Sequence, residues 1–131
     1  MSDGREWILR YDHAPMLVNA LEKKAHWSVR SEMRLEWRAA FHLLALEQKI
    51  PKLDAVFVTV QHYKAKGVLP DPDACQPSVK AAIDGCLVDA GIVPDDSGEF
   101  VKGILYLPPL KGLDALELTI SEVVSSVCGG V

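Results

Sequence analysis

The sequence predicts a small α/β domain with the element order β-α-β-α-β-β, a mixed four-stranded sheet packed with two helices. Residues 29–48 and 77–90 carry apolar side chains at the three- and four-residue spacing of amphipathic helices. Residues 55–61 form a β-branched run, and residues 116–121 alternate strictly between apolar and polar. Helices that alternate with strands in this way predict an α/β fold.

The first half of the chain predicts a strand, a long helix and a second strand. Residues 6–11 (EWILRY) alternate as a strand does, and a proline turn follows them. Trp37 and Phe41 lie on the apolar stripe of the long helix, which Pro51 ends. Residues 55–61 (AVFVTVQ) have little polar content, which predicts a strand covered on both faces.

The second half predicts a shorter helix and two further strands. Pro77 is placed to begin the helix and Gly91 to cap its C-terminus. The turn-rich residues 92–98 (IVPDDSG) lead into a strand over residues 100–107. Because a proline pair and a Lys-Gly turn separate that strand from residues 116–121, we expect the last two strands to form a hairpin.

Length and composition limit the class of protein. The chain has 131 residues, 49% of them hydrophobic, which predicts one domain with one core. We expect that domain over residues 1–123 and a flexible C-terminal tail over residues 124–131. No apolar run is long enough to span a bilayer and the N-terminus lacks the layout of a signal peptide, so we expect no membrane contact and a cytoplasmic location.

Neither the cysteines nor most of the histidines predict a site. The three cysteines form no CxxC pair, which predicts reduced core thiols and neither a zinc site nor a disulfide. His13, His42 and His62 lack metal-ligand spacing with one another or with a cysteine, and we assign them no role.

The formal charge of −4 conceals an asymmetry between the halves of the chain. Up to Gly67 there are 11 Lys and Arg against 8 Asp and Glu, a net +3. The remainder has 3 against 10, a net −7. An acidic half of this kind is either an ordinary solvated surface or a place where cations bind.

Four aspartates of the acidic half are the candidates for chemistry. Asp71 and Asp73 flank a proline on a segment expected to be extended, and Asp95 and Asp96 supply two more carboxylates about twenty residues later. Carboxylates suit Mg²⁺, and two such ions support the hydrolysis of a phosphodiester. The same residues are also common in turns, where Asp73 could help to start a helix. From spacing alone, the solvated-turn interpretation is favoured.

The sequence PDPDACQPSVKAAIDGCLVDAGIVPDDSGEF, residues 70–100, resembles the signature of the RusA family of Holliday-junction resolvases. In that signature a D-x-D-N element leads into a lysine-bearing helix, which ends in an A-G-(hydrophobic)-x-D-D loop. The last strand (ALELTISE) is similar to the closing strand of the family, and Asn19 matches an asparagine after the first strand and its proline turn. The resemblance therefore covers most of the chain.

The resemblance implies a function. Members of the family are homodimeric, Mg²⁺-dependent endodeoxyribonucleases, often carried by phages, that resolve four-way DNA junctions in recombination and repair. This chain would then hydrolyse phosphodiesters of branched DNA in the cytoplasm of a bacterial host cell, with Mn²⁺ as a possible substitute metal. A nuclease for flaps, forks or other branched DNA, and a catalytically inactive DNA-binding relative, are the alternatives. The implied catalytic residues are Asp71, Asp73, Asp96 and Lys80, and the implied metal ligands are Asp71, Asp73, Asp95 and Asp96.

The chain departs from the family pattern at three places. Ala74 stands where an asparagine usually follows the second aspartate, and Lys80 lies seven residues after Asp73, a longer gap than usual. Residues 68–70 (VLP) replace the basic residues that commonly precede the first aspartate. Phosphate contacts must then come from other cations, because Lys and Arg provide most sequence-independent affinity for DNA. Our candidates are Lys23, Lys24, Arg30, Arg34, Arg38, Lys64 and Lys66, which could equally form a solvated surface.

The predicted helix separates the two pairs of aspartates. From residue 77 to residue 90 it would be about 20 Å long at 1.5 Å per residue, with Asp73 and Asp95 at opposite ends. Either residues 92–94 fold back along the helix, or the aspartates of one subunit complete the centre of the other across a two-fold interface. The sequence leaves both arrangements open.

Overall fold

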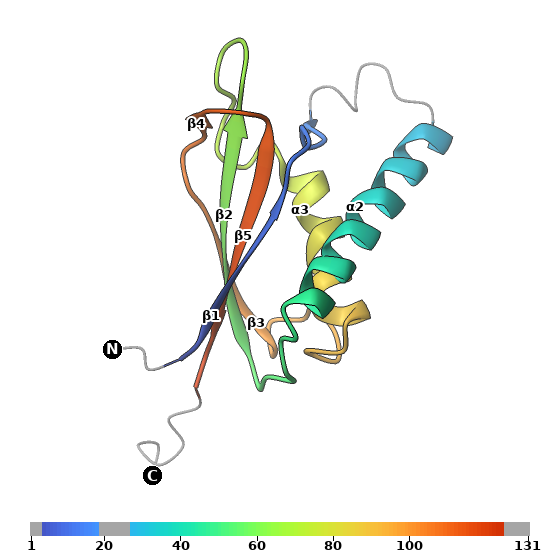
Figure 1. Cartoon of the computed structure of the whole chain (residues 1–131), viewed down its shortest axis with the longest axis vertical. Coiled ribbons are helices and arrows are strands. Elements are labelled where there is room, and N and C mark those ends of the chain that lie inside the picture. Colours follow the sequence, from blue (N-terminus) through green and yellow to red (C-terminus); the bar gives the residue numbers. More distant parts are fainter. Residues whose placement is uncertain (1–3, 19–26, 125–131) are drawn as a thin grey trace.

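The protein is a mixed α+β domain in which one sheet carries both helices on the same face (Figure 1). The structure is a computed structural model that describes residues 4–18 and 27–124. The predicted tail therefore lies almost wholly outside the described residues. The elements in chain order are β1 (Glu6–Tyr11), α2 (Trp27–Glu47), β2 (Val56–Lys64), α3 (Gln76–Ile83), η1 (Asp84–Asp89), β3 (Val101–Tyr106), β4 (Leu110–Lys111) and β5 (Ala115–Glu122).

The sheet has the order β1-β5-β2-β3, with the short β4 also paired to β2. The final strand β5 lies between β1 and β2 and is antiparallel to both. β3 and β4 are parallel to β2. The chain passes from β2 through α3 to β3, the connection that parallel neighbours require. The predicted order of helices and strands is confirmed, with the two-residue β4 as an unpredicted fifth strand.

The predicted hairpin between the last two strands is wrong. β3 pairs with β2, and residues 107–114 carry the chain across β2 to place β5 on its other side. β5 is nevertheless an antiparallel strand with one buried face, as its alternation of apolar and polar residues indicates, since Leu116, Leu118 and Ile120 are fully buried. A pattern of this kind specifies the face of a strand but not its neighbours.

The expectation that β2 is covered on both faces is also wrong. Its residues alternate between buried and half-buried along most of the strand, so only one face is closed. The buried face carries Val56, Val58 and Val60, which pack under the helices. The opposite face carries Phe57 and Thr59, which remain partly exposed although the strand lies inside the sheet.

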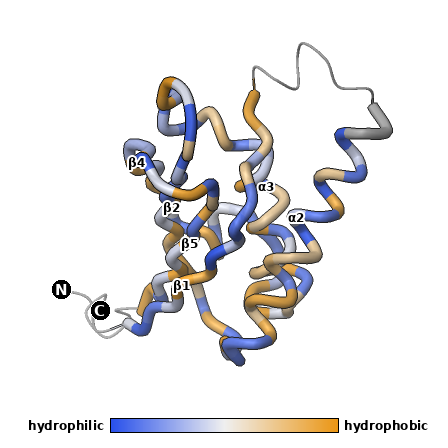
Figure 2. The backbone as a smooth tube through the Cα atoms, turned by 45° about the horizontal axis from the view of Figure 1, so that its top comes forward, coloured by the Kyte–Doolittle hydropathy of each residue, from blue (hydrophilic) through white to orange (hydrophobic). Residues whose placement is uncertain are grey.

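Helix α2 contributes an aromatic cluster to the core. Trp37 and Phe41 are buried and stack at a ring separation of 6.1 Å. The ring of Tyr11 on β1 meets Trp37 edge to face at 4.8 Å, and its hydroxyl donates a hydrogen bond to Glu36. In Figure 2 the tube of α2 alternates between hydrophilic and hydrophobic along its length, as an amphipathic helix should. No described helix is both long and apolar enough to cross a membrane.

The second predicted helix begins and ends as expected but is not regular throughout. Its first part, α3, is followed by the π-helical η1, which ends before Gly91. The φ of Gly91 is 77°. This left-handed conformation suits glycine, and the predicted cap is confirmed. At the join, Gly85 lies against the backbone of α2, where an added Cβ would overlap the carbonyl oxygen of Arg38.

We expect Gly85→Ala to lower the free energy of unfolding by about 2 kcal/mol, because the methyl group forces α2 and η1 apart. Urea denaturation measures the change. The matched control is Gly98→Ala, whose added methyl group would meet open space. Equal stability of the two variants would show that the helices do not approach each other this closely.

Candidate functional site

Asp71 and Asp73 lie in the turn that precedes α3. We expected an extended segment, but the structure has a turn. The carbonyl of Asp71 accepts a hydrogen bond from the amide of Ala74 at 3.1 Å, and the carbonyl of Asp73 accepts one from the amide of Gln76 at 3.0 Å. Both aspartates are exposed. The turn is tied to the chain after β1, where the amide of Val18 donates to the carbonyl of Ala74 at 2.9 Å.

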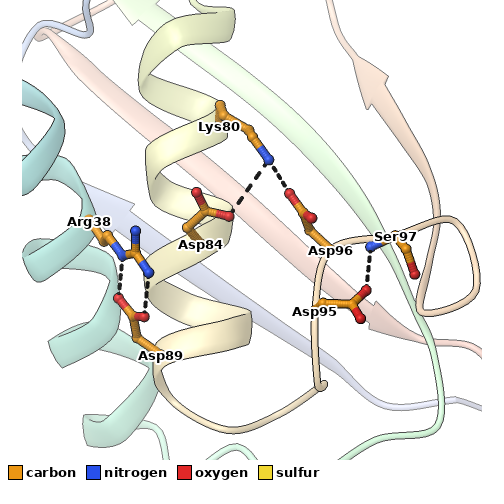
Figure 3. A network of polar contacts seen from close by, with 7 residues as sticks. All are labelled: Arg38, Lys80, Asp84, Asp89, Asp95, Asp96 and Ser97. Atoms are coloured by element: carbon orange, nitrogen blue, oxygen red, sulfur yellow. Dashed lines mark hydrogen bonds and ion pairs between the residues drawn. The ribbon is translucent and has the colours of Figure 1, made fainter.

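Asp95 and Asp96 lie in the loop after η1 and point to different partners (Figure 3). The carboxylate of Asp95 accepts the backbone amide of Ser97 at 2.8 Å, and hydrogen bonding from Ser97 lowers the pKa of Asp95 below its usual range. Asp96 forms an ion pair with Lys80 of α3. The loop therefore folds back along the helix far enough to bring Asp96 to a residue in the middle of α3.

Lys80 is held between two carboxylates, those of Asp96 and Asp84 (Figure 3). Its ammonium lies 3.7 Å from Asp84, one helical turn further along. The hydrogen bond to Asp96 raises the pKa of Lys80, and the same bond lowers the pKa of Asp96. Asp84 was not among the predicted site residues, although its four-residue spacing from Lys80 on a helix could have indicated it.

A cavity of about 140 Å³ lies between α3 and β3 beside this ion pair. Lys80, Asp96 and Tyr106 line it. Burial raises the pKa of Tyr106 to about 12, and the negative charge of Asp73 contributes to the same shift. Asp73 is thus close enough to act electrostatically on a group that lines the cavity. Of the four predicted aspartates only Asp96 lines the cavity, and Asp73 acts on Tyr106 through its charge alone.

A second cavity, of about 260 Å³, lies in the groove between α2 and α3. Arg34, Arg38, Lys80 and Asp84 line it, so Lys80 borders this groove as well as the cavity beside β3. The sequence did not predict that basic residues of α2 would lie next to the lysine of α3. Their proximity follows from the packing of the two helices on one face of the sheet.

The predicted DNA-binding cations within the described residues are divided between α2 and the end of β2. Arg38 donates two hydrogen bonds to Asp89 of η1, at 2.6 and 2.8 Å (Figure 3), and so joins the two helices. Arg34 is exposed, whereas Arg30 is half-buried. Lys64 and Lys66 lie at the end of β2 and line a different cavity. The remaining two candidates, Lys23 and Lys24, fall outside the described residues.

The carboxylates have the oxygen donors that Mg²⁺ prefers, but the four predicted ligands do not form one cluster within a chain. Across residues 4–18 and 27–124, no group of three or more His, Cys, Asp or Glu side chains is arranged to hold a metal ion. Asp96 is already neutralised by Lys80, and Asp95 is bound to the backbone. A metal centre made by all four acids would need a second chain or a rearrangement.

No known protein family matches the chain, and no curated protein matches it significantly. The resemblance to RusA nucleases therefore remains an expectation from the sequence motifs alone, one of which, Asn19, lies outside the described residues.

Replacing Lys80 with methionine should raise the pKa of Asp96 towards its ordinary value, because the ammonium that stabilises the carboxylate is removed. Titration of the aspartate carboxyl carbons by NMR measures this shift. Asp89 provides an internal control, since its low pKa comes mainly from its hydrogen bonds with Arg38 and should not change. An Asp96 titration curve that is unaffected by the substitution would exclude the ion pair.

Proposed function

We propose that this protein is a Mg²⁺-dependent, structure-specific endodeoxyribonuclease of the RusA type that resolves four-way DNA junctions as a homodimer. Its place of action would be the cytoplasm of a bacterial host cell. The observation that carries the proposal is the ion pair between Lys80 and Asp96, two residues of the motif that lie 16 positions apart. The sequence resemblance alone assigns both residues to the site.

The surroundings of Lys80 suit the binding of a phosphodiester. Arg34 and Lys80 line one groove and offer cationic donors that match phosphate oxygens. Arg38 keeps its positive charge beside them, although Asp89 accepts its hydrogen bonds. Asp96 lies on the other side of Lys80, in the cavity beside β3, and Asp84 lines the groove itself. A backbone phosphate in the groove would therefore lie near these two carboxylates, and its hydrolysis would require a metal ion between phosphate and carboxylates.

Each residue has a distinct part in this proposal. Lys80 would stabilise negative charge on the phosphoryl group, and Asp96, with Asp84, would hold the lysine in place. Asp71 and Asp73 would supply the exposed carboxylates. Mg²⁺, or Mn²⁺ in its place, enters through the resemblance to RusA, and its centre requires carboxylates beyond those that one chain brings together.

Two alternatives follow from particular observations. The same groove would accept any exposed DNA backbone, so a nuclease for flaps or forks is the nearest alternative. A catalytically inactive DNA-binding relative is favoured by the ion pair itself, because Lys80 occupies the carboxylate of Asp96 that a metal would need. Ala74, in place of the usual asparagine, favours the same alternative.

We expect the purified protein to nick four-way junctions only when Mg²⁺ is present, and Asp73→Asn or Asp96→Asn to lower the rate by about 100-fold. Cleavage of four-way, forked and linear DNA, compared on sequencing gels, measures both activity and preference. Glu99→Gln is the matched control, since Glu99 is an exposed acid three residues after Asp96 that is not one of the implied catalytic or metal-binding residues. Binding to junctions without metal-dependent cleavage would instead support the inactive relative.

If the metal centre is shared across a dimer, mixing Asp71→Asn subunits with Asp96→Asn subunits should restore cleavage. Each mixed dimer then has one centre in which both aspartates are intact. A mixture of Asp71→Asn and Asp73→Asn is the control, because these residues come from the same turn and no intact centre can form. If cleavage is restored only in the first mixture, the two subunits share the metal centre. If cleavage is restored in neither mixture, the result supports a centre within one chain.

A further inference from the structure

A cavity of about 280 Å³ at the end of β2 lies apart from the groove used in the function proposed above, although Lys64 and Lys66, two of the predicted DNA-binding cations, line it. Its apolar wall comes from the segment after β1, including Pro15 and Leu17, and its polar wall from the end of β2 and the turn before β5. The polar groups are those of His62, Lys64, Lys66 and Asp114.

His62 is the unusual member of this group. It is only 3% exposed, and its Nδ1 atom is closed off from solvent with no hydrogen-bond partner in the described structure. Burial lowers the pKa of the imidazole, and the charge of Lys64 lowers it further while Asp114 opposes the change. The ring is therefore neutral near pH 7, and one of its nitrogens carries a proton.

The unpartnered Nδ1 indicates which nitrogen that is. A proton on Nδ1 would leave a buried donor without an acceptor, which proteins tolerate less well than an unpaired acceptor lone pair. The neutral ring is therefore expected to carry its proton on Nε2. His62 lines the cavity, and Nε2 is the nitrogen with a proton to donate to a ligand there. His62 then offers the cavity a neutral N–H donor.

The charged groups around the cavity favour an anion. Lys64 and Lys66 contribute two positive charges and Asp114 one negative charge, a net charge of +1 with His62 neutral. The carboxylate of Asp114 is partly satisfied because it accepts the backbone amide of Ala65 at 2.9 Å. Lys64 donates to the carbonyl of Lys66, which holds the short loop after β2 in a compact form. The cavity thus combines one buried N–H donor with two ammonium groups.

We propose that this cavity binds a phosphate group, with His62 as a neutral hydrogen-bond donor and Lys64 and Lys66 as the cations. A phosphate accepts several hydrogen bonds at once and carries the charge that two lysines balance. The phosphate would be either a free ion or a phosphodiester of nucleic acid. The site depends neither on cleavage nor on a metal, so its failure would leave the proposed nuclease function untouched.

Inorganic phosphate should shift the ring ¹⁵N and ¹H signals of His62 in a saturable manner, whereas chloride at the same ionic strength should not. Lys66→Ala should weaken phosphate binding by about tenfold, the loss of one charge-assisted hydrogen bond. Asp114→Asn should strengthen binding, because among the described residues it removes the one carboxylate that lines the cavity while its side-chain oxygen can still accept the amide of Ala65. Lys102→Ala, at an exposed lysine of β3, is the control and should have no effect.

The opposite signs of the two substitutions make the test specific, since general misfolding would weaken binding in both. A short DNA duplex, added in competition with phosphate, identifies the source: displacement indicates a backbone phosphodiester, and no displacement indicates a small phosphate. The proposal is overturned if the His62 signals do not saturate, or if Lys66→Ala binds phosphate as tightly as the unsubstituted protein.

Discussion

The pairing of β5 with both β1 and β2 is the constraint on which the rest of the fold depends. The last described strand, β5, lies between β1 and β2, so the sheet forms only when residues far apart in sequence pair with one another. This insertion assigns β3 to the far side of β2, next to α3. Without it, β3 and β5 could form the local hairpin that their sequences suggest, and the loop after η1 would have no reason to lie against α3.

The ion pairs of the candidate site follow from that arrangement. Lys80 projects from α3 towards the loop that precedes β3, where Asp96 meets it (Figure 3). On the other side, Arg38 of α2 joins Asp89, and Gly85 allows the two backbones to approach. The contacts are partly exposed, so their contribution to stability is modest. Their importance lies in position, because they place cations and carboxylates on either side of one helix.

The two candidate sites differ in how visible they are in the sequence. Asp71, Asp73, Lys80 and Asp96 stand out because they form a linear motif, whose spacing can be compared with that of a known family. His62 belongs to no motif, and its interest comes from burial and from an unpartnered ring nitrogen. Asp84 is intermediate, since helical spacing relates it to Lys80 but only the folded loop adds Asp96. Helical spacing therefore identifies neighbouring residues on one helix, but it does not identify a site such as that of His62, to which several elements contribute.

The sequence by itself determined the identity and order of the main elements and, for α2 and β5, which face of the element would be buried. Trp37 and Phe41 on α2 and the alternation in β5 were visible because helical and strand periodicity are local properties. Only the tertiary structure decided that β5 pairs with β1 and β2, that one face of β2 stays partly exposed, and that Asp96 returns to Lys80. These depend on which surfaces meet, and contacts between distant residues leave no periodic trace in a single sequence.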